Sequence, residues 1–164
     1  MNDWITPDWP APGNVRALFT TRNGGVSSGP YASLNLGDHV GDDPAAVKQN
    51  RALLRGILPS EPRWLKQVHG TTPIRVDDYD CAAGSDAAFS QRTDTVCAVL
   101  TADCLPVFLC DAAGSTVGIV HAGWRGLAAG VIERTIAEMS VKNSPLMAWL
   151  GPAIGPGNFE VGAE

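Results

Sequence analysis

The sequence predicts one α/β (α+β) domain in which a mixed central sheet is flanked by helices. Apolar runs at 95–100, 106–111 and 115–121 lack clean alternation, which is typical of strands covered on both faces. Segments with helical spacing at 44–58 and 127–139 occur between such runs, as in mixed folds. The chain has 164 residues, of which 45% are hydrophobic, and this is sufficient for one core.

The N-terminal part begins with a predicted strand at 15–21. The Gly-, Ser- and Asn-rich stretch that follows, 22–43, favours a long irregular loop. Asp43 and Pro44 are typical of a helix start, with Asp as N-cap and Pro in the first helical position. At about 100° per residue, one apolar arc of the predicted helix 44–58 contains Val47, Leu53, Leu54, Ile57 and Leu58.

Asn50 falls near the middle of this arc and Arg51 at its edge. Two interpretations remain open. Arg51 could extend along the rim of the core while Asn50 bonds to neighbouring backbone. Alternatively, the two residues form an anion- or substrate-binding pair.

The rest of the chain is predicted to form two strands, a helix and two loops. We expect a strand at 63–70 that ends at His69, and loops at 77–86 and 111–115. A helix over 127–139 and a last strand at 146–150 complete the domain. The apolar face of that helix contains Leu127, Val131, Ile132, Thr135, Ile136 and Met139.

Composition excludes several function classes. The formal net charge of −5 and a pI of about 5.1 argue against nucleic acid as a partner. No apolar run approaches the roughly 18 residues of a membrane span. The N-terminus has neither the basic nor the apolar region of a secretory signal, so we expect a cytoplasmic protein. In that compartment Cys81, Cys97, Cys104 and Cys110 are expected to be reduced thiols.

His69, Cys104 and His121 each lie at an end of a predicted strand. Two imidazoles and one thiolate suit zinc or copper, and three protein ligands leave a coordination position open, which is typical of catalytic zinc. Their separations of 35 and 17 residues match no local metal motif. Cys104 alone therefore remains open as a core thiol, a nucleophile, half of a disulfide or a metal ligand.

The segment HAGWRG, 121–126, leads into the predicted helix. Its glycines allow close approach of a ligand, and Arg125 could donate to an anion at the helix N-terminus. The alternative is a simple strand–turn–helix junction. Asp103, beside Cys104, is either a proton carrier or partner of a ligand, or an exposed loop acid.

Several stretches together resemble the YfiH-type family, also called the laccase-domain or multicopper polyphenol oxidase family. They are TRNGGVS (21–27), PYASLNLGDHVGDDP (30–44), QNR (49–51), LKQVHG (65–70), TADCLPV (101–107), HAGWRGLAAGV (121–131) and LGPAIGP (150–156). The resemblance implies a fold similar to that of the cytotoxic-necrotizing-factor cysteine hydrolases. It implies zinc bound by His69, Cys104 and His121, and phosphate at Arg51. It also implies that residues 1–164 form a single domain that lacks the C-terminal part usual in the family.

The resemblance implies a zinc-dependent purine nucleoside phosphorylase with adenosine deaminase activity. Its substrates would be a purine nucleoside and phosphate, held by Arg51, Asn50 and Arg125. One alternative is copper-dependent polyphenol oxidation, although three histidines are few for a multicopper centre. The other is a cysteine or zinc amidase acting on a cell-wall precursor, in which Cys104 is the nucleophile and His121 its base. A non-enzymatic alternative is a structural zinc site in a protein with an unassigned binding role.

Overall fold

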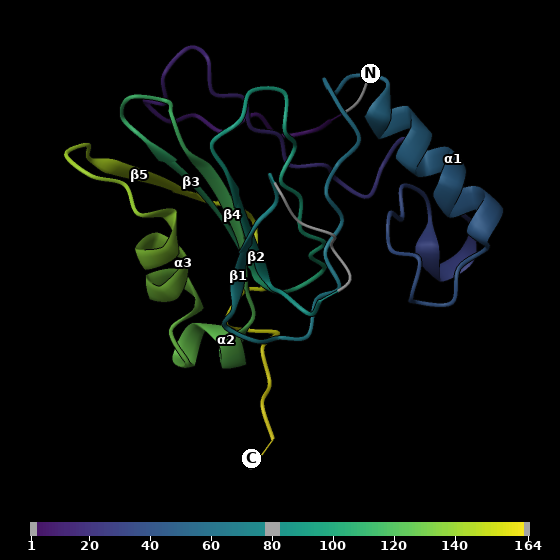
Figure 1. Cartoon of the computed structure of the whole chain (residues 1–164). Helices are drawn as coiled ribbons and strands as arrows, with labels where there is room; N and C mark the ends of the chain where they lie inside the picture. Colours follow the sequence, from purple (N-terminus) through teal and green to yellow (C-terminus); the bar gives the residue numbers. More distant parts are fainter. Residues whose placement is uncertain (1–2, 78–82, 163–164) are drawn as a thin grey trace.

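A five-stranded mixed sheet forms the centre of the molecule in a computed structural model that describes residues 3–77 and 83–162 (Figure 1). The strands are β1 (Pro73–Arg75), β2 (Ala87–Ser90), β3 (Leu105–Asp111), β4 (Val117–Ala122) and β5 (Leu146–Leu150), in the spatial order β1-β2-β4-β3-β5. Only β1 and β2 pair in parallel, and the other neighbours are antiparallel. The predicted strands at 106–111, 115–121 and 146–150 are confirmed, and the predictions missed β1 and β2.

Three other predicted strands are wrong. The segments 15–21, 63–70 and 95–100 contain only isolated bridges, namely Ile5 with Phe19, Arg63 with Cys97, and Lys66 with Gly84. The last two segments lie across a face of the sheet, where Leu65, Cys97 and Val99 pack onto its apolar residues. The segments 63–70 and 95–100 have the composition of strands because a segment that covers a sheet also needs apolar residues.

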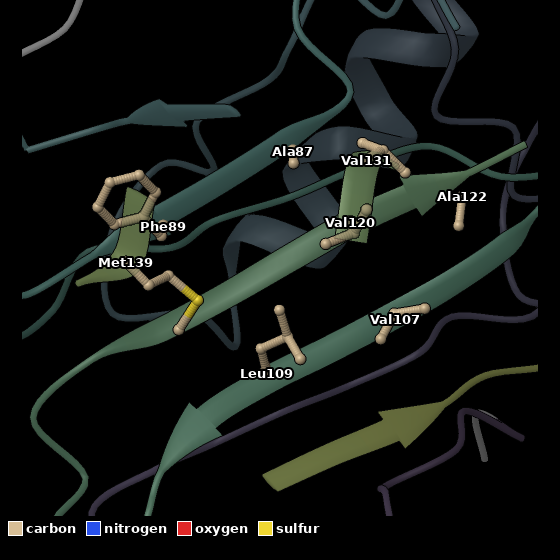
Figure 2. Packing of buried hydrophobic residues seen from close by; sticks show 8 residues of the cluster. All are labelled: Ala87, Phe89, Val107, Leu109, Val120, Ala122, Val131 and Met139. Atoms are coloured by element: carbon tan, nitrogen blue, oxygen red, sulfur yellow. The ribbon is translucent and has the colours of Figure 1, made fainter. Parts of the chain in front are cut away.

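The two faces of the sheet have different covers. On one face, Val131 and Met139 of α3 (Val131–Met139) pack on side chains from β2, β3 and β4 (Figure 2). The other face carries Ile74, Val76, Ala88 and Ile119, which are covered by the irregular segments. This second face is the one that holds the candidate site.

The predicted helix 127–139 is wrong as a single element. The chain forms a short helix, α2 (Trp124–Ala128), and then α3, because Gly130 between them adopts a left-handed conformation with φ 88°. Val131, Thr135 and Met139 are buried as expected. Leu127 is exposed, since the break turns α2 away from the register of α3, and Ile136 of α3 is exposed as well.

Helix α1 (Pro44–Arg55) begins as predicted, because Asp43 accepts a hydrogen bond from the Ala45 N–H at 2.9 Å. It ends three residues before the predicted position. Its buried side chains are Val47, Asn50 and Leu54, while the predicted apolar residues Leu53 and Ile57 are exposed. The long stretch 22–43 is irregular as expected, apart from a 3₁₀ turn at Gly29–Tyr31.

Within the described part of the chain, no helix is both long and apolar enough to span a bilayer. No disulfide joins the described cysteines, and Cys81 lies outside the described residues.

Candidate metal centre

His69, Cys104 and His121 come together in the structure. One potential ligand atom from each residue lies within 4.8 Å of the other two. The imidazole rings of His69 and His121 meet edge to face, with 4.9 Å between their centroids. A single ion could therefore contact all three side chains, as the sequence predicted.

The register of β3 against β4 explains how Cys104 and His121 meet. Leu105 pairs with Ala122, so one further step places Cys104 opposite Gly123. His121 lies two residues before Gly123 and points to the same face of the sheet. The two ligands are thus diagonal neighbours on paired strands, which places their side chains within reach of each other.

Gly123 provides the space in which the three ligands converge. A Cβ atom at this position would lie 3.0 Å from Cδ2 of His69, 3.1 Å from Sγ of Cys104 and 3.6 Å from Cε1 of His121. Any larger residue would occupy the centre of the cluster. Gly126 has a related role, because its Cβ would meet the Gly70 carbonyl oxygen at 3.1 Å, where α2 packs on the His69–Gly70 turn.

His69 lies on a turn outside the sheet. Its backbone has φ 57°, a left-handed conformation that is uncommon for residues other than glycine. The side chain is exposed, whereas His121 is buried at 4% exposure. The candidate centre therefore has one buried wall and one side open to solvent.

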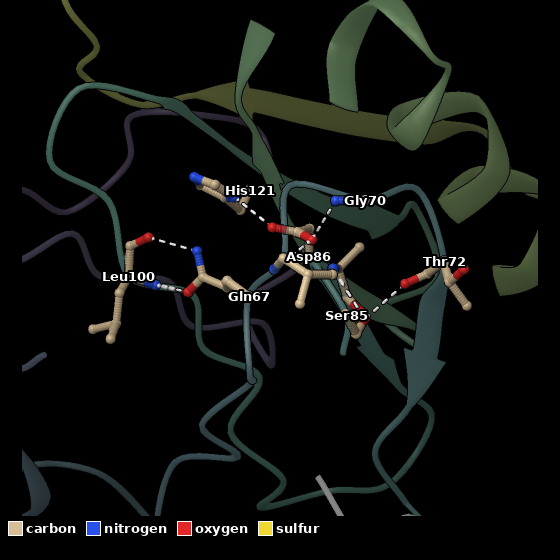
Figure 3. Close-up of polar contacts among 9 residues, drawn as sticks. Gln67, Gly70, Thr72, Ser85, Asp86, Leu100 and His121 are labelled. Carbon is tan, nitrogen blue, oxygen red and sulfur yellow. Dashed lines mark hydrogen bonds and ion pairs between the residues drawn. The ribbon is translucent and has the colours of Figure 1, made fainter. Parts of the chain in front are cut away.

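Asp86 is the functional residue that the sequence predictions missed. It is fully buried, and its Oδ1 lies 2.7 Å from Nδ1 of His121 (Figure 3). Its Oδ2 accepts hydrogen bonds from the N–H groups of Val68 at 3.1 Å and Gly70 at 2.7 Å. The only signal in the sequence was an acid directly before the apolar residues of β2, within a stretch expected to be a loop.

The pKa values of Asp86 and Cys104, the two ionisable neighbours in the centre, shift in opposite directions. Burial alone would raise the pKa of Asp86, but hydrogen bonds from Gly70, His121 and Val68 outweigh it and lower the pKa below its ordinary value. Burial, assisted by the negative charges of Asp103 and Asp86, raises the pKa of Cys104. The thiol of the metal-free protein is therefore protonated at neutral pH, and a bound cation would favour the thiolate.

The remaining predicted site residues lie in different places. Asp103 and Arg125 are exposed and flank the centre in the chain, with Arg125 above the ring of Trp124 at 4.7 Å. Asn50 and Arg51 belong to α1, which lies across the molecule from α2 in Figure 1. The structure does not bring these two residues to the three candidate ligands.

The side chains of Asn50 and Arg51 have partners of their own. Asn50 accepts from the Val26 N–H at 2.8 Å and donates to Ser27, Ser33 and Asn35, so it organises the 22–43 loop. Arg51 donates to the Leu36 carbonyl at 2.9 Å, approaches Asp38 at 3.2 Å and stacks on Trp64. A substrate-binding role for either residue stays a prediction.

The donor set fits a transition metal. Two imidazoles and a thiolate are the ligands of zinc and copper rather than of magnesium or calcium. The Asp86 contact on Nδ1 leaves Nε2 of His121 for the ion, which is the usual arrangement around zinc ligands. Among the described residues this is the one His, Cys and acid cluster suited to a metal.

Comparison with known proteins gives consistent results. A family model described as multi-copper polyphenol oxidoreductase laccase matches residues 16–164. A purine nucleoside phosphorylase of Pseudomonas aeruginosa is 54% identical over 164 residues, which are 100% of this chain and 67% of that protein. The purine nucleoside phosphorylase YfiH of Escherichia coli is 52% identical over 167 residues, covering 100% of this chain and 69% of that protein.

Two solved structures share the fold. A Neisseria meningitidis protein of family DUF152 superposes with a TM-score of 0.91 at 50% identity, covering 98% of this chain and 66% of that one. YlmD from Geobacillus stearothermophilus gives a TM-score of 0.85 at 31% identity, covering 95% and 64%. The chain thus spans about two thirds of the length of the relatives that it matches.

Proposed function

The chain belongs to the family described as multi-copper polyphenol oxidoreductase laccase, and from this premise we propose that it is a zinc-dependent purine nucleoside phosphorylase with adenosine deaminase as a second activity. The convergence of His69, Cys104 and His121 on one open site carries the proposal. The names of the Pseudomonas and Escherichia relatives supply the reaction. We also propose a cytoplasmic location, in keeping with reduced thiols at the described cysteines Cys97, Cys104 and Cys110.

In phosphorolysis, phosphate forms a bond to the anomeric carbon of the nucleoside while the bond from that carbon to the purine nitrogen breaks. The purine takes up a proton as it leaves. When bound by His69, Cys104 and His121, zinc would supply a Lewis acid with an open coordination position. The exposed side of the centre, at His69, is the side from which a nucleoside would enter.

The residues of the chain have separate proposed roles. Asp103 is exposed beside Cys104, and we assign it the transfer of a proton to the leaving purine. Arg125, on α2 directly after the centre, is our first candidate for holding phosphate through its forked guanidinium. Arg51, with Asn50, is a second candidate that rests on the family resemblance and on the position of the pair in the predicted helix.

Copper oxidation fits this chain less well than zinc chemistry. A multicopper oxidase needs many imidazoles for several copper ions, and this sequence has three histidines. His39, the third, is paired with Asp38 at the surface. One mixed imidazole and thiolate site for a single ion is what the described residues offer.

A cysteine amidase is the second candidate function, and one observation favours it. Asp86, His121 and Cys104 are arranged in the order acid, base and nucleophile that cysteine hydrolases share. In this interpretation, which also draws on the similarity to the cytotoxic-necrotizing-factor hydrolases that the sequence resemblance implies, His69 has no role. The position of His69 within 4.8 Å of the same sulfur favours a metal centre instead.

The test is the release of purine from inosine or adenosine, measured with and without phosphate. We expect phosphate-dependent formation of hypoxanthine or adenine, and its loss in both Cys104→Ala and His69→Ala. A His69→Ala variant that retained full turnover would contradict the metal centre. A wild type that releases no purine from either nucleoside would contradict the phosphorylase and leave the amidase. Ammonia released from adenosine without phosphate reports the deaminase separately.

Metal analysis gives an independent answer. Protein purified without added metal should contain close to one zinc per chain, and Cys104→Ala should contain far less. Copper in place of zinc, or no metal in the wild type, would contradict the proposal.

A further inference from the structure

We propose that Asp86 is a positioning residue that sets the geometry of both histidine ligands at once, an inference that rests on the proposed metal centre. Its two carboxylate oxygens have different tasks. Oδ1 contacts the ring of His121, and Oδ2 binds the backbone on both sides of His69 (Figure 3). One buried side chain therefore links two ligands that are far apart in the sequence.

The contact with His121 determines which nitrogen faces the metal. Asp86 precedes β2 and lies opposite His121 on β4, whose backbone N–H donates to the Asp86 carbonyl at 2.7 Å. Side-chain and main-chain contacts thus both join Asp86 to His121. Because an ionised carboxylate only accepts, Nδ1 of His121 must carry the hydrogen, and Nε2 presents a lone pair to the ion.

The contacts with Val68 and Gly70 determine the turn that carries His69. Both N–H groups point to Oδ2, so the carboxylate closes a loop around His69 and stabilises its left-handed backbone at φ 57°. Next to Asp86, the Ser85 N–H donates to the Lys66 carbonyl at 3.0 Å and attaches the same segment to the start of β2. The exposed His69 therefore has a fixed backbone although its side chain faces solvent.

An amide cannot replace this carboxylate. In Asp86→Asn, an oxygen turned toward Val68 and Gly70 leaves the NH₂ group facing His121, which must then accept on Nδ1 and carry its hydrogen on Nε2. With the amide flipped, the NH₂ group faces two N–H donors and the His69 turn loses its acceptor. Either orientation disturbs one of the two ligands while the volume of the side chain is unchanged.

Asp111→Asn is the matched control. Asp111 is equally buried, lies at the far end of β3 from Cys104, and accepts from the Ser115 and Thr116 N–H groups on Oδ1. Its Oδ2 accepts from the Ser115 hydroxyl, which can accept from an amide instead, so this variant keeps its hydrogen bonds. It removes a buried charge without touching the candidate centre.

Zinc affinity is measured by competition with a chromophoric chelator for the wild type and both variants. We expect Asp86→Asn to bind zinc about 10- to 100-fold more weakly, and Asp111→Asn to stay within about threefold of the wild type. The visible spectrum of the cobalt-loaded protein should change in Asp86→Asn alone. Equal affinity and an equal spectrum in Asp86→Asn and the wild type would overturn the inference.

A second measurement needs no variant, and it decides the question if Asp86→Asn does not fold. In the metal-free wild type at about pH 8, ¹⁵N NMR should show the hydrogen of His121 on Nδ1. A hydrogen on Nε2 would overturn the inference. If the wild type binds no zinc, the proposed function fails. If the wild type and Asp86→Asn bind zinc equally well, the proposed metal centre stands and only the inference about Asp86 fails.

Discussion

Substitution of Gly123 by alanine tests the packing of the candidate centre directly. Gly123 has φ −62° and ψ 156°, which is extended backbone that any residue adopts, so alanine adds no strain to the main chain. The added Cβ would lie 3.0 Å from a carbon of His69 and 3.1 Å from the sulfur of Cys104. The substitution therefore acts on the ligands rather than on the fold.

The size of the effect follows from these contacts. Carbon atoms in ordinary contact lie about 3.5–4.0 Å apart, so His69 and Cys104 must each withdraw by roughly half an ångström. Metal sites tolerate deviations of only about 0.2 Å in ligand distance. We expect zinc affinity to fall by about 10- to 100-fold, as for other disturbances of ligand geometry. This loss corresponds to about 1.4–2.8 kcal/mol of binding free energy.

The assay is chelator competition, with thermal unfolding of the metal-free proteins measured in parallel. Gly118→Ala is the control, because Gly118 lies on β4, the strand that leads to Gly123, and its Cβ would meet Sδ of Met139 at 3.1 Å, away from the centre. We expect Gly118→Ala to lose stability and retain zinc affinity. Gly123→Ala should retain the stability of the metal-free protein and lose zinc affinity. If Gly123→Ala binds zinc as tightly as the wild type, the three side chains do not converge as described.

Three further predictions concern stability and ionisation. Asn50→Ala should lower the free energy of unfolding, measured in urea, by about 2–4 kcal/mol, because it leaves buried hydrogen-bond partners in the 22–43 loop unsatisfied. Lys48→Ala, on the exposed side of α1, is the control and should have little effect. Burial alone would raise the pKa of Asp111, but hydrogen bonds from Ser115 and Thr116 outweigh burial and lower this pKa. The ionised carboxylate therefore contributes stability that is present above about pH 4 and is lost as the pH falls through the folded-state pKa. Urea titrations from neutral to acid pH should therefore show Asp111→Asn losing less stability than the wild type, and parallel curves would refute this. The negative charge of Asp103 adds to burial in raising the pKa of Cys104. Asp103→Asn removes this charge, so the Cys104 thiol of the metal-free protein should react faster with iodoacetamide at about pH 8. An unchanged rate would contradict a role of the Asp103 charge.

Apolar runs in the sequence predicted three of the five strands, namely β3, β4 and β5. β3, β4 and β5 were found within two residues of their ends because long apolar runs have few alternatives in a small domain. β2 was missed because it is short and begins among Ser85 and Asp86, which read as a loop. The segment 63–70 was misread because an extended chain that covers a sheet has the same composition as a strand within it.

The candidate centre was predictable in its residue types and not in its supporting contacts. His69, Cys104 and His121 stood out because histidines are rare in the chain and each precedes or follows an apolar run. Asp86 depends on the register of β2 against β4, which no local pattern encodes. Asn50 was visible as a polar residue within an apolar arc, but its four loop partners lie 15 to 24 residues earlier in the chain.

The wide spacing of the ligands has a consequence for folding. No two of them lie closer than 17 residues in sequence, and the turn of His69 is held through Asp86, which directly precedes β2. A short local fragment of the chain therefore cannot chelate the ion with all three ligands, and the ladder between β3 and β4 must close before Cys104 and His121 meet. Metal uptake during refolding would mark the completion of long-range topology, and a cobalt spectrum would follow that late event in real time.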